Sequence, residues 1–355
     1  MVTHVQALSS LIIGSILGLS TSPISARPLI IGYAPAFRPL AESIDRSDVD
    51  RYTHINIAFA NPDARGLMVD GGKLTCMPQA DKTMMRLDAL KGAVAALKAK
   101  DIQVSVSIGG GVIPACSGDW RTLLAPDRRE STLAGLLQLV DDLGLDGIDV
   151  DIEGALLTEI DKAGNFTPFI AALSAGMKQR GKLLSCATAS YDGGMIPIDS
   201  IPYFDLVNVM SYDAIGPSWG RAGAEHSTYA AAMRDLQLWR ARGVEKERLV
   251  LGVPFYGYGF GGFRPNWAFR DLLSSHGQGA LQADVIGKAC PGCAYITFNA
   301  PATIRSKAKL AAERGAGVMV WEMSQDSEDG ALLTAIEAGF GDATPRPGGN
   351  APTFR

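Results

Sequence analysis

Three acidic residues alternate with β-branched residues in one short run of the chain. Asp149, Asp151 and Glu153 are separated by single valine or isoleucine residues within the sequence LDGIDVDIE. Because successive side chains of a β-strand point to opposite faces, a strand here would place the three carboxyl groups on one face. Repulsion and loss of water raise the pKa of such groups, so at least one should hold a proton near neutral pH. Such a carboxyl group suits protonation of a leaving oxygen, and the run predicts general acid catalysis.

A structural role and a metal-binding role for the acidic run both remain open. A solvated edge strand would also alternate polar and apolar side chains. A Ca²⁺ or Mg²⁺ site could draw on the same carboxylate oxygens, but the ligand order of an EF-hand loop and its central glycine are missing. Three crowded carboxylates are expensive for stability alone, which favours a catalytic role over a structural one. We expect no metal or cofactor.

Short apolar runs alternate with helical patterns along the chain. The predicted strands are residues 28–33, 53–60, 102–108, 145–153, 183–189, 205–212, 249–255 and 317–321. Helical spacing of apolar residues marks 81–98, 127–143, 165–179, 229–242 and 302–314. Such alternation implies parallel strands, and eight units in about 310 residues predict one α/β domain, a closed (β/α)₈ barrel. Active sites of such barrels lie at the carboxyl ends of the strands, where Glu153 would be outermost.

An open doubly wound sheet is the alternative fold. It is disfavoured because no GxGxxG turn follows the first predicted strand. Two intervals depart from the barrel pattern: only 15 residues separate the fifth and sixth strands, and residues 257–300 form a glycine- and aromatic-rich insertion between the seventh strand and its helix. The sequence contains no internal repeat and no second domain.

Composition excludes several classes of protein. Hydrophobic residues make up 47% and charged residues 20%, as in a globular protein with a sizeable core. The 33 Lys and Arg residues against 37 Asp and Glu give a net charge of −4, and the basic residues form no long run. Nucleic acid is therefore not an expected partner.

The two ends of the chain differ in composition from the rest. Residues 1–26 contain a twelve-residue apolar stretch followed by small and polar residues, which predicts a signal peptide cleaved after Ala26. The stretch is short of the roughly 20 residues of a spanning helix, so no membrane association is expected after cleavage. We expect a secreted or periplasmic protein with a catalytic domain at 27–340 and a disordered tail at 341–355.

An oxidising compartment would allow the five cysteines to form disulfides. Cys76 and Cys116 follow apolar strands in polar loops, and we expect them to pair with each other. Cys290 and Cys293 are expected to form a local disulfide, because no second Cys/His pair stands at a zinc-binding spacing. Cys186 lies in an apolar run and is expected to stay free and buried.

The acidic run resembles the D-x-x-D-x-D-x-E signature of the family-eighteen glycoside hydrolases, the retaining chitinases and their relatives. Other segments resemble further motifs of that family in the same order. Ser107, Gly109 and Gly110 match its third-strand SxGG motif, and Met210, Tyr212 and Asp213 match its sixth-strand MxYD motif. The PFYG segment containing Tyr256 and the GVMVWE segment containing Trp321 match its seventh and eighth strands. The resemblance extends over nearly the whole expected mature chain.

The resemblance implies a role for each matched residue. Glu153 would protonate the glycosidic oxygen and later act as base on water. Asp151 would orient the acetamido group of the substrate, which serves as nucleophile in this family, and Asp149 would tune the shared proton. Tyr212 would donate to the acetamido carbonyl oxygen. Asp146 would have a supporting structural role.

Further residues are expected to contact the sugar. The resemblance implies that Asp213 binds near the cleavage site and that Trp321 forms the floor beneath the sugar. Tyr33 and Tyr256 stand near the ends of predicted strands and could line the mouth. Aromatic faces suit pyranose rings, so three loop tryptophans are also candidates for stacking: Trp120, Trp219 and Trp267.

The resemblance implies a secreted, monomeric, retaining chitinase that cleaves β-1,4-linked N-acetylglucosamine polymers. The short insertion favours a shallow groove and internal cleavage. Alternatives are an endo-β-N-acetylglucosaminidase acting on N-glycans and a relative acting on peptidoglycan. A chitin-binding lectin without activity is disfavoured, because such relatives typically replace the terminal acid and Glu153 is intact.

Overall fold

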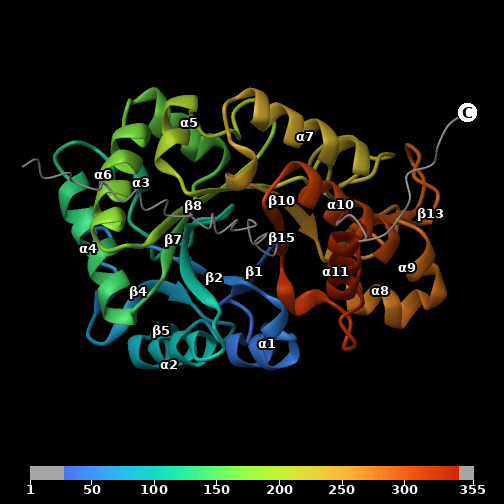
Figure 1. Ribbon diagram of the computed structural model, residues 1–355, viewed down its shortest axis with the longest axis horizontal. Helices are drawn as coiled ribbons and strands as arrows, with labels where there is room; N and C mark the ends of the chain where they lie inside the picture. Colours follow the sequence, from blue (N-terminus) through green and yellow to red (C-terminus); the bar gives the residue numbers. More distant parts are fainter. Residues whose placement is uncertain (1–27, 344–355) are drawn as a thin grey trace, which may run out of the picture.

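Eight parallel strands close into a barrel in the computed structural model, which describes residues 28–343 (Figure 1). Around the barrel the strand order is β1-β15-β10-β9-β8-β7-β6-β2. Their bounds are β1 (Leu29–Pro35), β2 (His54–Ala60), β6 (Gln103–Gly109), β7 (Gly147–Asp151), β8 (Leu183–Thr188), β9 (Leu206–Val209), β10 (Leu249–Pro254) and β15 (Gly317–Trp321). The predicted α/β barrel and all eight predicted strands are confirmed.

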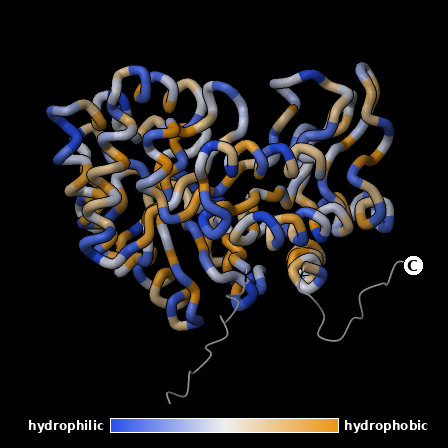
Figure 2. Tube along the Cα trace, turned by 45° about the horizontal axis from the view of Figure 1, so that its top comes forward, coloured by the Kyte–Doolittle hydropathy of each residue, from blue (hydrophilic) through white to orange (hydrophobic). Residues whose placement is uncertain are grey.

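The barrel strands are apolar because helices cover one face and the barrel interior buries the other. Every residue of β7 and β10 is buried. In Figure 2 the hydrophobic colour is concentrated in the interior, whereas hydrophilic segments lie mainly at the periphery. A polar side chain buried in such a strand is therefore an exception, and it needs a hydrogen-bond partner to offset the cost of its burial.

Helices surround the barrel and cover its strands (Figure 1). They are α1 (Leu40–Arg46), α2 (Leu87–Lys98), α3 (Trp120–Leu123), α4 (Arg129–Leu143), α5 (Gly154–Lys162), α6 (Phe166–Gln179), α7 (Tyr229–Ala241), α10 (Pro301–Arg314) and α11 (Ala331–Ala343). Short 3₁₀ turns occur at Val49–Arg51, Ile198–Tyr203, Lys246–Arg248 and Met323–Gln325. The turn at Ile198–Tyr203 occupies the short interval between the fifth and sixth barrel strands.

One predicted helix is wrong in its first part. Residues 84–86, expected at the start of a helix over 81–98, form strand β5 (Met84–Arg86). This strand pairs with β4 (Lys73–Pro78), which also pairs with β3 (Val69–Asp70), in a small antiparallel sheet. Helical spacing of apolar residues cannot reveal such pairing, because the partner strand lies outside the window of the pattern.

The insertion after β10 folds into an α+β unit. Its antiparallel sheet has the order β12 (Asn266–Ala268), β11 (Tyr256–Phe260), β14 (Tyr295–Thr297) and β13 (Val285–Gly287). Helices α8 (Phe269–His276) and α9 (Gln278–Gln282) connect β12 to β13. The chain continues from this unit into α10. Tyr295 and Thr297 of β14 form hydrogen bonds with Gly223 and His226 in the segment between β9 and α7.

The end of the domain differs slightly from prediction. Helix α11 continues to Ala343, so the predicted tail is wrong for residues 341–343. The predicted signal peptide at 1–26 and residues 344–355 lie outside the described residues. No helix between residues 28 and 343 combines the length and apolarity needed to cross a bilayer.

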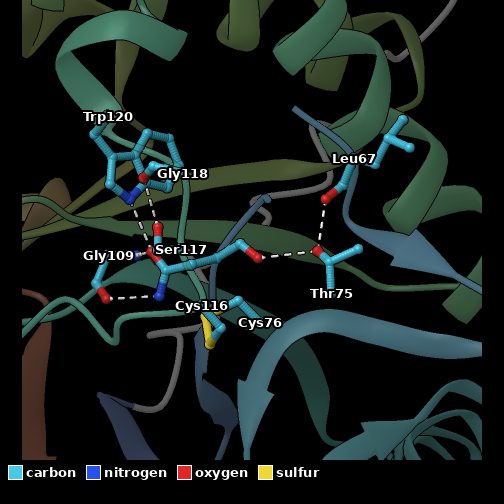
Figure 3. The surroundings of a disulfide bond; sticks show 9 residues. Leu67, Thr75, Cys76, Gly109, Cys116, Ser117, Gly118 and Trp120 are labelled. Atoms are coloured by element: carbon cyan, nitrogen blue, oxygen red, sulfur yellow. Dashed lines mark hydrogen bonds between the residues drawn. A yellow bond between two sulfur atoms is a disulfide. The ribbon is translucent and has the colours of Figure 1, made fainter. Parts of the chain in front are cut away.

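Both expected disulfides are present, and Cys186 is free and buried. The Cys76–Cys116 bond joins β4 to the loop after β6, with 5.3 Å between the Cα atoms (Figure 3). Asn61 lies beside it and receives a hydrogen bond from the indole of Trp120 at 2.8 Å. The Asn61 amide also donates to the Gly109 carbonyl oxygen at 3.1 Å, so this disulfide region supports the end of β6.

Candidate active site

A cleft of 1130 Å³ opens at the carboxyl ends of the barrel strands. Tyr33 of β1, Glu153 after β7, Asp213 after β9 and Trp321 of β15 are among the residues that line it. A cavity of 610 Å³ at the opposite end of the barrel is lined by the amino-terminal residues of several strands and by Asp146. Asp149, Asp151 and Glu153 thus form a line that runs from the barrel interior to the 1130 Å³ cleft.

Asp149 lies in the barrel interior, where its carboxyl group is fully buried. Parallel register places Ser107 of β6 and Ser185 of β8 directly beside it. Four side chains donate to the carboxyl group: Tyr33 Oη at 2.6 Å, Ser107 Oγ at 2.7 Å, Ser185 Oγ at 2.6 Å and Asn208 Nδ2 at 3.2 Å. Burial raises the pKa of Asp149, and the hydrogen bonds oppose that shift by stabilising the charged form.

Asp151 is buried one step closer to the cleft and is 3% exposed. Burial raises its pKa well above the usual value, and the charges of Glu153 and Asp149 raise it further. Among the described residues, its Oδ1 atom has no hydrogen-bond partner. A buried acceptor without a partner is unfavourable in the protein alone, and an N–H group of a ligand would satisfy it.

Glu153 follows the end of β7 and reaches the cleft. Burial is the main cause that raises its pKa to about 7, and the charge of Asp213 also raises it. A hydrogen bond with Asp151 acts in the opposite direction. A carboxyl group that titrates near neutral pH can both give and take a proton, as general acid–base catalysis requires.

Two glycines at the end of β6 make room for these acids. Gly109 has a φ of +96°, and a Cβ atom on it would lie 2.4 Å from the Asp151 carbonyl oxygen. Gly110 has a φ of +101°, and its Cβ would meet the Phe59 ring at 2.8 Å. Both positions require glycine because the backbone is left-handed and a neighbour approaches closely. The SxGG segment therefore combines a donor to Asp149 with close packing against β7.

Tyr212 and Asp213 enter the cleft from the loop after β9. Burial raises the pKa of Tyr212 well above its usual value, so the hydroxyl stays protonated and can donate. Its Oη lies 3.6 Å from the Met319 sulfur. Met210 lines the cleft and packs on the small inner cluster that contains Tyr33 and Met319.

Tyr256 does not line the cleft, contrary to the expectation for it. It is buried and donates a hydrogen bond to Asp213 Oδ1, so it holds that carboxylate from behind. Tyr33, the other tyrosine expected at the mouth, does line the cleft while donating to Asp149.

Trp321 stands across the barrel from Glu153, since β15 is four places from β7 in the strand order. Its ring stacks on Phe59 with 5.7 Å between centroids and meets the edge of Tyr33 at 5.6 Å. These contacts hold a flat aromatic surface at the base of the cleft.

Other predicted residues are not brought to the site. Asp146 accepts hydrogen bonds from Lys98 Nζ at 2.7 Å and from the Val104 backbone at 3.0 Å, at the opposite end of the barrel. Of the three loop tryptophans, Trp219 lines the cleft and is 43% exposed. Trp120 is buried beside Asn61, so stacking on sugar is wrong for it. Trp267 lies under the Arg264 guanidinium at 3.8 Å and does not line the cleft.

Sequence patterns missed several residues of the site. Exposed Phe37, Val112 and Tyr191 line the cleft from loops after β1, β6 and β8. His226 is fully buried at its edge, with Nδ1 3.6 Å from Asp213 Oδ1, and burial lowers its pKa. For Ser185 and Asn208 a signal existed, because each is a polar residue in an otherwise apolar strand. Within residues 28–343, the His, Cys, Asp and Glu side chains form no group of three or more suited to a metal ion.

Comparisons with known proteins agree with this geometry. The model of the glycosyl hydrolases family 18 matches residues 30–326. Chitinase 63 of Streptomyces plicatus is 29% identical over 238 residues, which are 55% of this chain and only 38% of that protein. A solved family 18 chitinase from the chitin utilisation locus of Flavobacterium johnsoniae is 28% identical, with a TM-score of 0.74 over 89% of this chain and 94% of that one.

A more distant solved structure shares the fold. The family 18 chitinase of Cycas revoluta in complex with (GlcNAc)₃ is 20% identical, with a TM-score of 0.70 over 88% of this chain and 99% of that one. The family match covers most of the chain and includes the acidic run, both glycines after β6 and the loop after β9. The chain belongs to the glycosyl hydrolases family 18.

Proposed function

We propose that the protein is a retaining chitinase that hydrolyses β-1,4 linkages between N-acetylglucosamine units. The observation that carries the proposal is the line of three carboxyl groups from buried Asp149 and Asp151 to partly exposed Glu153. Burial raises the pKa of its outermost member, Glu153, to about 7, and its middle member, Asp151, has a buried oxygen without a hydrogen-bond partner among the described residues. Family 18 enzymes use the substrate's acetamido group as nucleophile, and this site offers the groups that such a reaction needs.

In the first step, protonated Glu153 gives its proton to the glycosidic oxygen, and the bond from that oxygen to the anomeric carbon breaks. The acetamido carbonyl oxygen attacks the same carbon and forms a cyclic cationic intermediate. Asp151 accepts from the acetamido N–H and stabilises the developing charge. In the second step, Glu153 as carboxylate takes a proton from water, which opens the ring. Two inversions give net retention.

Two further groups orient the substrate in this proposal. The protonated hydroxyl of Tyr212 donates to the acetamido carbonyl oxygen and turns it toward the anomeric carbon. Trp321 supports the apolar face of the same sugar, because its indole is held flat by Phe59 and Tyr33. Holding the reacting atoms in this way replaces a bimolecular encounter with an intramolecular one.

We also propose internal cleavage of the polymer. The Trp321–Glu153 line divides the barrel mouth, with Phe37 and Val112 on the side of β1 and β6 and Tyr191 and Trp219 on the side of β8 and β9. Exposed apolar side chains on both sides offer surface for several sugars. None of the residues that line the cleft belongs to the insertion between β10 and α10.

Export from the cytoplasm is part of the same proposal. Two disulfides, Cys76–Cys116 and Cys290–Cys293, are typical of proteins that fold in an oxidising compartment. The substrate, an extracellular polymer, requires the same location.

Product analysis tests the proposed function. We expect mass spectrometry to show cleavage of chitin hexasaccharide into shorter N-acetylglucosamine oligomers, and NMR of the fresh product to show the β-anomer first. Parallel incubations would contain an N-glycoprotein and peptidoglycan, with Glu153→Gln as the inactive control. If the protein released sugars from the N-glycoprotein or from peptidoglycan but did not cleave the chitin hexasaccharide, chitin would not be its substrate. A first-formed α-anomer would contradict participation of the acetamido group.

A further inference from the structure

Lys307 of α10 is a fully buried lysine outside the cleft. Its ammonium group donates to Ser227 Oγ at 2.7 Å, to the Ser227 carbonyl oxygen at 3.0 Å and to Asn299 Oδ1 at 2.7 Å. An ammonium group has three N–H donors, so these bonds use all of them. Within residues 28–343, no carboxylate forms an ion pair with it.

This arrangement carries an energetic penalty. Burial lowers the pKa of Lys307 to about 7, and the charges of Asp284, Asp235 and Glu225 oppose the shift only in part. Removing a cation from water is costly when no ion-pair partner is present, and hydrogen bonds to neutral groups offset only part of that cost. An apolar residue would fill the position at a lower desolvation cost, which points to a role for the hydrogen bonds themselves.

The hydrogen bonds of Lys307 lead to the loop after β9. Ser227 Oγ, which accepts from Lys307, donates to the Ser211 carbonyl oxygen at 2.6 Å. The neighbouring His226 carbonyl oxygen accepts from the Ala214 backbone N–H at 3.0 Å. Both ends of the segment 211–214 are therefore bonded to residues 226–227. Tyr212 and Asp213 lie between these two attachments.

Two more elements complete the support. Ser211 Oγ donates to Asp235 Oδ2 of α7 at 2.5 Å. From the end of the insertion, Asn299 Nδ2 donates to the Ser227 carbonyl oxygen at 2.7 Å, and Thr297 Oγ1 accepts from the His226 N–H at 3.2 Å. The side chains of Lys307, Ser227 and Asn299 are all buried, so water does not compete for these bonds.

We propose that Lys307 is a positioning residue for the loop after β9. Through Ser227 and Asn299 it fixes the segment 211–214, so that Tyr212 and Asp213 meet the reacting sugar in one geometry. The effect on turnover rests on the proposed function, whereas the effect on the loop does not. A catalytic donor displaced by about 1 Å can lower the rate by about 10²-fold, so the position of this segment matters.

The Lys307→Met variant tests the proposal, because it keeps a long unbranched side chain and removes the charge and all donors. Lys309→Met is the matched control: Lys309 lies on the same helix, is partly exposed and forms a salt bridge with Glu313 at the surface. Assays with chitooligosaccharides at about pH 6 keep Lys307 protonated, because that pH is below its pKa. We expect kcat to fall by about tenfold or more with KM within about twofold for Lys307→Met, and no change for Lys309→Met.

Hydrogen exchange provides a second measurement that does not depend on activity. Backbone amides of a peptide covering 210–215 should exchange faster in Lys307→Met, while peptides from β1 and β7 keep the wild-type rates. If Lys307→Met does not fold, Ser227→Ala takes its place, since it removes the link to Ser211 and leaves Lys307 its other two acceptors. The same local change is expected for it.

The outcomes separate the two proposals. Wild-type kcat and unchanged exchange at 210–215 would overturn the positioning role. Faster exchange throughout the barrel would also overturn it, because Lys307 would then serve general stability. A wild-type protein without activity on chitooligosaccharides, but with the local change in Lys307→Met, would leave the positioning role in place and refute the proposed function.

Discussion

Proton occupancy of single residues decides what this site can do. Asp149 is surrounded by four donors, Asp151 is buried without enough partners, and Glu153 stands at the cleft. Each step outward along β7 changes the solvation of the carboxyl group while the spacing stays constant. The strand therefore gives three carboxyl groups different surroundings, and under the proposed function the outermost one exchanges protons with the substrate.

Replacement of Glu153 by glutamine tests its catalytic role. Glu153→Gln keeps the shape of the side chain and removes the exchangeable proton, so kcat should fall by at least about 10²–10⁴. Tryptophan fluorescence should still detect oligosaccharide binding at wild-type affinity. Activity close to wild type would assign the proton transfer to another residue.

The same variant has a predicted effect on stability. The folded-state pKa of Glu153 is about 7 against an ordinary 4.5, so its protonated form favours the fold, and this contribution is lost as pH rises from 4.5 through about 7. The charged carboxylate of Glu153 therefore destabilises the fold at pH values above about 7. Glutamine does not ionise. Calorimetry should therefore give Glu153→Gln a higher Tm than wild type at pH 8, with the difference shrinking toward pH 4.5.

At the scale of elements, contact between β6 and β7 brings the acids to their partners. The register sets Ser107 beside Asp149, and Gly109 beside Asp151. Gly109 lets the two backbones approach, while the Asn61 amide holds its carbonyl oxygen. The site therefore depends on backbone geometry in β6 as much as on the acidic side chains.

Gly109→Ala should disrupt this contact. The added Cβ would meet the Asp151 carbonyl oxygen at 2.4 Å in a left-handed backbone, and strain with overpacking should lower the free energy of unfolding by about 3 kcal/mol or more. Gly92→Ala on α2 is the matched control, because nothing lies within 4 Å of its Cβ position. Urea denaturation should show the control equal to wild type or up to about 1 kcal/mol more stable. Equal midpoints for both variants would contradict the close approach.

At the scale of the whole molecule, two disulfide bonds are expected to contribute to the stability of the fold. Cys76–Cys116 joins residues 40 apart in sequence, whereas Cys290–Cys293 joins residues 3 apart. In the chain-entropy model a disulfide stabilises by restricting the unfolded chain, and the effect grows with the closed loop. The first bond should therefore contribute more than the second.

Paired serine substitutions test this difference. Replacing Cys76 and Cys116 should lower the free energy of unfolding by about 4 kcal/mol, and replacing Cys290 and Cys293 by about 2 kcal/mol. Denaturant unfolding of the two double variants would be compared with that of the wild type. A larger loss from the pair at 290 and 293 would contradict the entropic argument and indicate that this bond holds the insertion in place.

The sequence by itself determined the barrel and the acidic face of β7. Strand alternation places side chains two residues apart on one face, and helical spacing repeats every three or four residues, so both are visible within a short window. Resemblance to a family then named the roles of residues such as Glu153 and Tyr212. The hairpin of β4 and β5 escaped because β4 lies before the window of residues that was matched to helical spacing.

Only the tertiary structure decided which residues converge. Tyr33 donates to Asp149 across 116 positions and Lys307 to Ser227 across 80, distances over which no local period carries information. Trp219 lines the cleft, while Trp120 and Trp267, equally plausible in sequence, lie elsewhere. Burial and hydrogen bonding depend on how the closed barrel brings its loops together. Which tryptophan lines the cleft and which one packs elsewhere is therefore decided by closure of the barrel, not by any sequence motif.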